Sequence, residues 1–264
     1  MNESPLGAAA FTGTGFAIDR QRMADLLGFD RVIASTHHSI GAGDHLTDTA
    51  FAVQSLAVGL SRVTKDLLFF ATQELGALHI DDSFIQISSI MPQKRNPVVL
   101  EHLRARLSRA LGYAQTVAVQ CHSIPYGDTQ DIEDEILPPV MAGLEAIQSC
   151  IQLYTAVFET LTLNEAHLAR RAGEGFTTTT TELADALVRE AGLPFRSAHL
   201  VRALDSRAFV EARNGLGGVA PSSTGVLLGE LTAAQALDQS IVEQKRQRLD
   251  EAERVRSAAV LAIS

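Results

Sequence analysis

The sequence predicts an all-α protein: an elongated bundle of long helices, followed by a small C-terminal helical domain. Apolar residues recur at spacings of three and four over unusually long segments, which is typical of helices packed in bundles. Alanine and leucine are abundant, tryptophan is absent, and only eight of the 264 residues are proline, all of which favours helix. The connections between the long segments are short for their length, as an elongated bundle requires.

The chain begins with a glycine-containing segment over 1–18, which predicts a loop. Asp19 is a suitable cap for a short helix over 19–27, which Gly28 would end. The clearest periodic element covers 44–78 and is far longer than the usual 11–12 residues, roughly, of a globular protein. A helix of that length needs long neighbouring helices to bury its apolar face. The predicted apolar stripe on that face consists of Val53, Leu56, Leu60, Val63, Leu67 and Phe70.

Two more long helices are predicted, over 97–122 and 138–161. Pro97 fits the first turn of one, and Pro138 with Pro139 fits the first turn of the other. The predicted stripe of the first consists of Leu100, Leu103, Leu107, Leu111, Ala114 and Val117, and that of the second of Val140, Leu144, Ile147, Ile151 and Phe158.

After residue 165 the predicted helices become shorter. They cover 181–191, 195–204, 206–213 and 239–262, with a glycine-rich loop over 215–221. The last helix carries charges of both signs and is expected to be a surface helix with many ion pairs. We therefore expect a central bundle domain over 1–165, itself incomplete, and a small helical domain over 166–264.

Charge and composition exclude several classes of function. The net charge is −9 and the pI about 5.3, which argues against a nucleic acid or an anionic membrane as partner. No apolar run reaches the roughly 18 residues of a membrane span, and the N-terminus does not resemble a secretory signal. Cys121 and Cys150 lack CxxC spacing and a metal-type cluster, so we expect reduced thiols, no metal and a cytoplasmic location.

The polar connection over 79–96 leads into the run Ser-Ser-Ile-Met-Pro-Gln-Lys-Arg-Asn-Pro at 88–97, here called the serine loop. Lys94, Asn96 and the start of the following helix together suit a carboxylate, because a helix N-terminus and a cation both favour anions. A serine beside such groups could act as a base. On the residues alone, a polar turn that caps a helix remains the competing interpretation.

The serine loop resembles the GSSxMPxKxNP motif of the fumarase/aspartase family, with Ile87 in place of the leading glycine. That resemblance implies a long-helix bundle of the family's type. It also implies that Ser88 is the catalytic base, which removes the proton next to a substrate carboxylate. Lys94 and Asn96 would hold that carboxylate, and Met91 would support the same anion site through its backbone. The other residues that the resemblance assigns are Glu101, as partner of a catalytic histidine, and Ser89 and Tyr126, as substrate-binding residues.

Other segments resemble the argininosuccinate lyase branch, notably 4–7, 18–20, 181–184 and 192–199. The second polar connection, over 122–135, departs from it, because no lysine follows the acidic pair Glu133-Asp134. That loop is more similar to the aminopolycarboxylate lyases, such as ethylenediamine-disuccinate lyase. An adenylosuccinate-type lyase is a further alternative, although Gln93 is less typical of it.

These relatives share one reaction. It removes an amine or guanidine from an N-(1,2-dicarboxyethyl) substrate and releases fumarate, without a metal or organic cofactor. The resemblance implies a homotetramer whose active sites each use three subunits.

No segment resembles the family's catalytic-histidine region, and His37-His38 lies in the wrong context. The chain is therefore expected to be a C-terminal portion that is inactive or nearly so alone, and that needs a separate N-terminal half. A non-catalytic assembly module is the alternative from another class of function. The remaining histidines, His79 among them, are interpreted as solvated, capping or structural residues.

Overall fold

A computed structural model describes residues 2–173, 180–198, 211–215 and 218–261. The predicted all-α class is confirmed, since the described elements are helices apart from three ladders of two residues per strand. The chain divides into two compact units, residues 1–163 with 247–264, and residues 164–246. The assignment of two domains over 1–165 and 166–264 stays a prediction. No described helix is both long enough and apolar enough to cross a bilayer.

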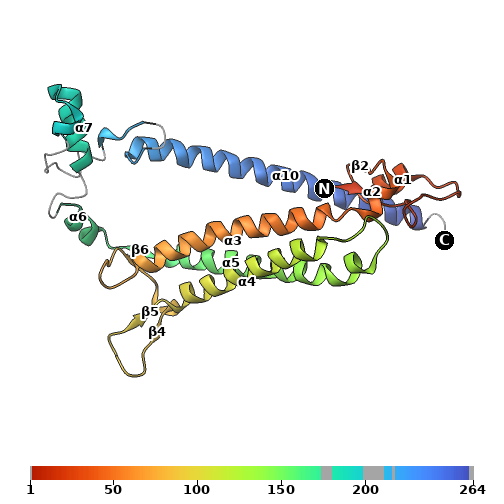
Figure 1. Cartoon of the computed structure of the whole chain (residues 1–264), viewed down its shortest axis with the longest axis horizontal. Helices are drawn as coiled ribbons and strands as arrows, with labels where there is room; N and C mark the ends of the chain where they lie inside the picture. The colour runs from red at the N-terminus through yellow and green to blue at the C-terminus, as the bar shows by residue number, and fades with distance from the viewer. Residues whose placement is uncertain (1, 174–179, 199–210, 216–217, 262–264) are drawn as a thin grey trace. The chain divides into compact units, whose positions relative to one another are not determined.

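Three long helices form the body of the first unit. They are α3 (Asp44–Phe70), α4 (Val98–Cys121) and α5 (Leu137–Thr160), which lie side by side in Figure 1. The helix predicted over 44–78 is corrected at its C-terminal end, because the chain turns after Phe70. The Ala77 N–H donates to the Phe70 carbonyl at 3.0 Å, and Gly76 takes a positive φ of 56° within this turn.

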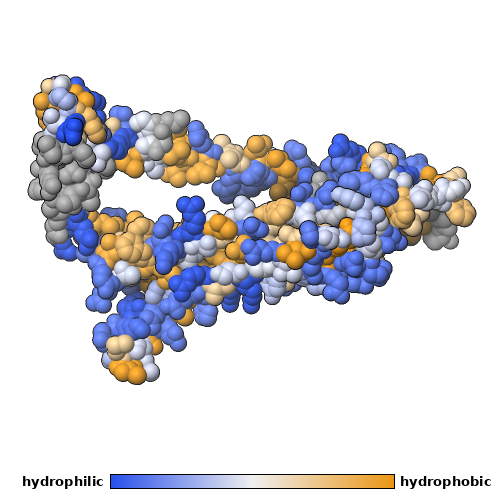
Figure 2. Space-filling view, viewed as in Figure 1, coloured by the Kyte–Doolittle hydropathy of each residue, from blue (hydrophilic) through white to orange (hydrophobic). Residues whose placement is uncertain are grey.

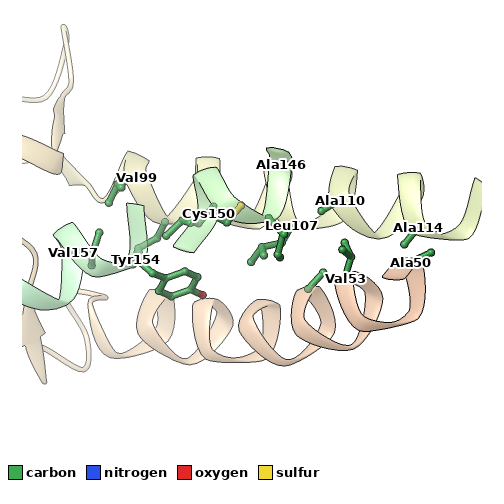
Figure 3. Close-up of a cluster of buried hydrophobic side chains, with 14 of the residues drawn as sticks. Ala50, Val53, Val99, Leu107, Ala110, Ala114, Ala146, Cys150, Tyr154 and Val157 are labelled. Carbon is green, nitrogen blue, oxygen red and sulfur yellow. The ribbon is translucent and has the colours of Figure 1, made fainter. Parts of the chain in front are cut away.

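The core between these helices confirms the stripe predicted for α4 almost completely, with Leu100, Leu103, Leu107, Ala114 and Val117 all buried. The stripes predicted for α3 and α5 are partly wrong. Their buried faces rely on smaller residues, many of which Figure 3 labels: Ala50, Val53 and Ala57 on α3, and Gly143, Ala146, Cys150 and Val157 on α5. Small side chains allow the helix backbones to approach closely.

A polar contact joins α5 to α3 inside this core. The Tyr154 hydroxyl donates to the Leu60 carbonyl at 2.6 Å and also lies in hydrogen-bond contact with the Thr64 hydroxyl. Burial raises the pKa of Tyr154, although its hydrogen bond with Thr64 works in the opposite direction. Because both hydroxyls are buried and partnered, the contact fixes one register between the two helices.

The N-terminal part of the first unit is made of short elements. Helix α1 (Arg20–Leu26) begins as predicted, since the Asp19 carboxylate accepts from the Arg22 N–H at 2.9 Å. Strands β1 (Glu3–Ser4) and β2 (Arg31–Val32) pair in parallel, and α2 (Thr36–Gly41) was not predicted because it is only six residues long. Strands β3 (Leu78–His79) and β6 (Thr162–Leu163), which follow the C-terminal ends of α3 and α5, pair antiparallel.

The last helix, α10 (Pro221–Leu261), corrects the predicted helix start at 239, whereas the described residues of the predicted loop over 215–221 are non-helical as far as Ala220. Pro221 occupies the first turn, and the Ala220 carbonyl accepts from the N–H groups of Ser223 and Thr224 at 3.0 Å. The predicted ion pairs are present along its exposed surface, for example Arg256 with Glu253 at 3.4 Å. Near its end, Arg248 pairs with Asp30 within the first unit.

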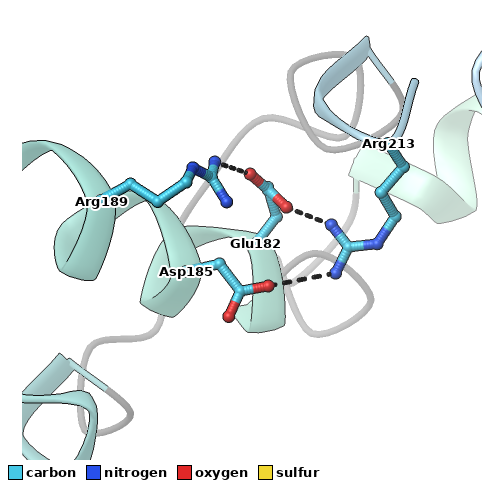
Figure 4. A network of polar contacts seen from close by, with 4 residues as sticks. All are labelled: Glu182, Asp185, Arg189 and Arg213. Atoms are coloured by element: carbon cyan, nitrogen blue, oxygen red, sulfur yellow. Dashed lines mark hydrogen bonds and ion pairs between the residues drawn. The ribbon is translucent and has the colours of Figure 1, made fainter. Parts of the chain in front are cut away.

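The second unit contains α6 (Glu165–Gly173), which was not predicted, α7 (Thr180–Ala191), and α8 (Phe195–Ala198). The helix expected over 195–204 is described only to Ala198, and most of the one expected over 206–213 lies outside the described residues. A network of charges joins α7 to Arg213 (Figure 4). Its centre is Glu182, a carboxylate only 2% exposed, which accepts from both Arg189 and Arg213.

Replacing Glu182 by glutamine is expected to lower the free energy of unfolding of the second unit by about 2–3 kcal/mol near neutral pH. Burial alone would raise the pKa of Glu182, but the hydrogen bonds from Arg189 and Arg213 outweigh burial and hold the pKa below its usual value. A lowered folded-state pKa means that this stabilisation is complete above the unfolded pKa of about 4.3 and is lost as the pH falls through the folded value.

Thermal unfolding followed by circular dichroism at neutral pH and at about pH 3 checks this expectation. The difference in melting temperature between the wild type and Glu182→Gln should disappear at the acidic pH. Glu190→Gln, an exposed position on the same helix, is the matched control and should change little. A difference in melting temperature that persists unchanged at low pH would contradict the role given to the Glu182 charge.

Candidate functional site

The serine loop forms the tip and the second strand of a β-hairpin. Strands β4 (Gln86–Ile87) and β5 (Arg95–Asn96) pair antiparallel through two residue pairs, Gln86 with Asn96 and Ile87 with Arg95. The segment between them is closed by the Lys94 N–H, which donates to the Met91 carbonyl at 3.0 Å. Figure 1 shows this hairpin extending away from the helical bundle beside the start of α4.

Ser88 occupies the first position of the turn. Its Oγ accepts from the Ile90 N–H at 3.2 Å and from the Met91 N–H at 3.1 Å. Two donors on one oxygen favour negative charge there. The same bonds also fit the structural interpretation of a polar turn, so this geometry is compatible with both interpretations made from the sequence.

The loop is open to solvent on its outer side. Ile87 and Ile90 are 75% and 86% exposed, and Met91 is 41% exposed. Figure 2 shows hydrophobic atoms gathered at the tip of this hairpin.

A cavity of about 910 Å³ lies beside the inner face of the hairpin. It is bounded by the end of α3, the turn after it, β3 and the serine loop. Three of the residues predicted to bind substrate, Met91, Lys94 and Asn96, line it, whereas Ser88, Ser89 and Glu101 do not. The other polar lining residues are Thr72, Gln73, Glu74, His79, Gln93 and Arg95.

A group of charged residues at the base of the hairpin was not singled out from the sequence. Asp82 begins a short 3₁₀ turn, η1 (Asp82–Phe84), and its carboxylate pairs with Arg95 of β5. The hydrogen bond from Arg95 lowers the pKa of Asp82, and His79 Nε2 lies 3.8 Å from the same carboxylate. The only signal in the sequence is the Asp81-Asp82-Ser83 run, which favours a turn but does not identify Arg95 as partner.

The remaining predicted residues lie apart from the cavity. Glu101 is exposed in the first turn of α4. Tyr126 is 70% exposed and follows the opposite end of α4, a helix of 24 residues. At 1.5 Å per residue, that helix separates Tyr126 from the serine loop by about 36 Å. One chain therefore does not bring Ser88 and Tyr126 together.

The described residues of this region form no metal-binding cluster. Within the residues that the structure describes, no group of three or more His, Cys, Asp or Glu side chains could hold a metal ion. The cavity instead offers Lys94, Arg95 and the Asn96 amide beside apolar walls, a combination that suits an organic anion.

Comparisons with known proteins identify the family of the chain. A family model described as lyase matches residues 1–112, and one described as argininosuccinate lyase C-terminal matches residues 177–208. An argininosuccinate lyase from Methanococcoides burtonii is 34% identical over 245 residues, which are 92% of this chain and 49% of that relative. Another, from Methanospirillum hungatei, is 37% identical over 75% of this chain and 40% of its own length. The chain belongs to the fumarase/aspartase superfamily of lyases.

A solved member of the superfamily has the same fold. The structure of an EDDS lyase variant with bound fumarate matches with a TM-score of 0.88 at 28% identity, covering 99% of this chain and 60% of that chain. The family resemblance predicted from the serine loop is thus confirmed. The chain spans about half the length of the curated relatives it matches, 49% in the case of the M. burtonii enzyme. The roles of individual site residues stay predictions.

Proposed function

We propose that this chain supplies the serine loop and the carboxylate-binding wall of a carbon–nitrogen lyase that resembles argininosuccinate lyase. The observation that carries the proposal is the arrangement of the SSIMPQKRNP run as a hairpin whose Lys94 and Asn96 line a 910 Å³ cavity. The substrate class is an N-(1,2-dicarboxyethyl) compound, and the products are fumarate and a free amine or guanidine.

The proposed reaction is a β-elimination that begins at Ser88. Its deprotonated Oγ takes the proton from the carbon next to one carboxylate, and the electron pair left behind forms the carbon–carbon double bond as the carbon–nitrogen bond breaks. Lys94 and Asn96 stabilise the negative charge that builds on that carboxylate, as preorganised donors do. The leaving nitrogen takes its proton from an acid outside these 264 residues, a histidine with which Glu101 would pair.

The leaving group is proposed from the relatives. Argininosuccinate is favoured by the matched argininosuccinate lyases and by the C-terminal model over 177–208. An aminopolycarboxylate of the ethylenediamine-disuccinate type is the second candidate, which the match to EDDS lyase and the loop over 122–135 favour. A screen of both substrates, with adenylosuccinate as third, separates these alternatives.

The test is release of fumarate, followed by absorbance near 240 nm, after mixing this chain with the half of the M. burtonii relative that it does not match. We expect little fumarate from the chain alone, and release that depends on Ser88 from the mixture. A stable mixed assembly that neither binds nor converts any of the three substrates would favour the non-catalytic assembly module.

We further propose that the chain assembles as a homotetramer through the outer faces of α3 and α5. Large apolar residues recur every seven positions on both helices and are exposed here, as in a bundle seam. Three of them, Leu56, Ile151 and Phe158, border a groove of about 630 Å³. The exposed rows consist of Leu56, Val63 and Phe70 on α3, and of Leu144, Ile151 and Phe158 on α5. Assembly would also allow Tyr126 of one subunit to reach the serine loop of another.

Light scattering at micromolar concentration is expected to give the mass of a tetramer for the unmodified chain. The double variant Leu56→Lys with Ile151→Lys places two charges in the groove and should shift the mass towards the monomer, because buried unpaired charges are costly. Ser108→Lys, on an exposed position of α4, is the control and should leave the mass unchanged. A monomeric unmodified chain would refute the proposal.

A further inference from the structure

The hairpin that carries the serine loop has a very small hydrogen-bonded base. Only two residue pairs join β4 to β5, and a two-stranded hairpin is marginally stable by itself. The loop nevertheless has to present Lys94 and Asn96 at a cavity wall within a small tolerance. A contact other than the β-ladder must therefore contribute to its position.

The ion pair between Arg95 and Asp82 has the right location for that contribution. Arg95 belongs to the residue pair nearest the tip of the hairpin, opposite Ile87. Its guanidinium reaches Asp82, in the turn that precedes β4. The pair therefore ties the return strand of the hairpin to a segment outside it.

The segment that carries Asp82 is itself well fixed. The Asp81 carboxylate accepts from the Ser83 N–H at 2.9 Å and from the Ser83 hydroxyl at 2.6 Å, which closes the turn. Ile80, just before the turn, is 3% exposed within the main core, and Ile85, just after it, packs against that core. Asp82 thus has a backbone held on both sides by the bundle, although its own side chain is exposed.

We propose that Asp82 and Arg95 are positioning residues, which hold the serine loop in register with the cavity so that Lys94 and Asn96 meet the substrate. This inference rests on the proposed function for its catalytic consequence, but the mechanical claim can be tested separately. Arg95 stands next to Lys94 in the sequence and lines the same cavity, so a direct contact with the substrate is the rival explanation.

The two explanations give opposite results for Asp82. If the ion pair positions the loop, Asp82→Asn and Arg95→Gln remove the same contact. Both variants then shift amide exchange, kcat and ligand affinity in the same direction. If Arg95 binds the substrate, Asp82→Asn frees the guanidinium and tightens the binding of a dicarboxylate, whereas Arg95→Gln weakens it.

The first experiment is hydrogen exchange on the full chain, followed at the hydrogen-bonded amides of Met91 and Lys94. Both single variants should exchange about two- to five-fold faster there, the range that corresponds to one exposed ion pair. Arg95→Lys should fall between the wild type and Arg95→Gln, and the swap Asp82→Arg with Arg95→Asp should restore slow exchange. Arg248→Gln breaks an ion pair of similar exposure with Asp30 and should leave the serine loop unchanged.

The second experiment measures kcat and KM for fumarate release in the complemented protein. Both single variants should lower kcat together, with rescue by the swap. Unchanged exchange in both variants overturns the proposal, and so do opposite shifts in the affinity for fumarate as a competing ligand. Faster exchange in both variants supports the positioning role even where the complemented protein releases no fumarate, a result that would count against the proposed function alone.

Discussion

Replacing Ser88 by alanine is expected to reduce the rate of fumarate release by the complemented protein about 10²–10⁴-fold, the usual contribution of a general base. The expectation follows from the position of Ser88 Oγ, which accepts from the N–H groups of Ile90 and Met91. Those donors favour the negatively charged form of the oxygen that has to take the substrate proton. The measurement is the initial rate at 240 nm under saturating substrate.

The Ser88→Ala variant also removes the acceptor of two backbone hydrogen bonds, so a loss of rate needs a control for loop structure. Ser88→Thr keeps a hydroxyl at the same place and should retain more activity than the alanine variant. Ser108→Ala removes an exposed serine from α4 and should leave the rate unchanged. A rate within tenfold of the wild type in Ser88→Ala would remove Ser88 from the role of base.

The serine loop could be found from the sequence because its residues are contiguous and their spacing is specific. The cavity beside it could be found only in part. His79 and Arg95 both approach Asp82 because a turn and a two-stranded ladder bring separate segments together. No periodicity in the sequence encodes such a contact. The same limit applies to Tyr126, whose separation from Ser88 depends on the direction and length of α4.

The helical stripes show a second limit of sequence patterns. On α4, which lies between its two neighbours, the apolar period and the buried face coincide. On α3 and α5 several large apolar residues, such as Leu56 and Phe158, are exposed, while Ala57 and Gly143 face the core. A heptad pattern reports that a face is apolar, but it cannot say whether the same chain or another copy covers it.

The start of α10 shows a third limit, which comes from helix propensity. Gly225 and Gly229 lie in its first turns, and each glycine costs about 1 kcal/mol relative to alanine in a helix. Two glycines this early disfavour a helix on propensity alone, and the helix was predicted to start only at residue 239. The structure begins the helix at Pro221, where the Ala220 carbonyl accepts from the N–H groups of Ser223 and Thr224.

Replacing Lys94 by glutamine is expected to lower kcat/KM about 10²–10³-fold, the typical effect of removing one preorganised donor from a site of developing charge. Lys94 lines the cavity, and its own backbone N–H closes the turn of the serine loop on the Met91 carbonyl. The variant removes the side-chain charge and leaves that backbone bond in place, so the geometry of the loop should survive.

The division of the Lys94 effect between kcat and KM tells how the ammonium acts. An equal loss in kcat and kcat/KM means that Lys94 contacts the charge that develops in the transition state, whereas a rise in KM alone means that it holds the substrate carboxylate throughout. Lys94→Arg keeps the charge and should retain part of the rate, although the planar guanidinium of arginine does not reproduce a compact ammonium. Lys245→Gln, on the exposed surface of α10, is the control for a lost positive charge. Wild-type kcat/KM in Lys94→Gln would show that the cavity beside the serine loop is not where the carboxylate binds.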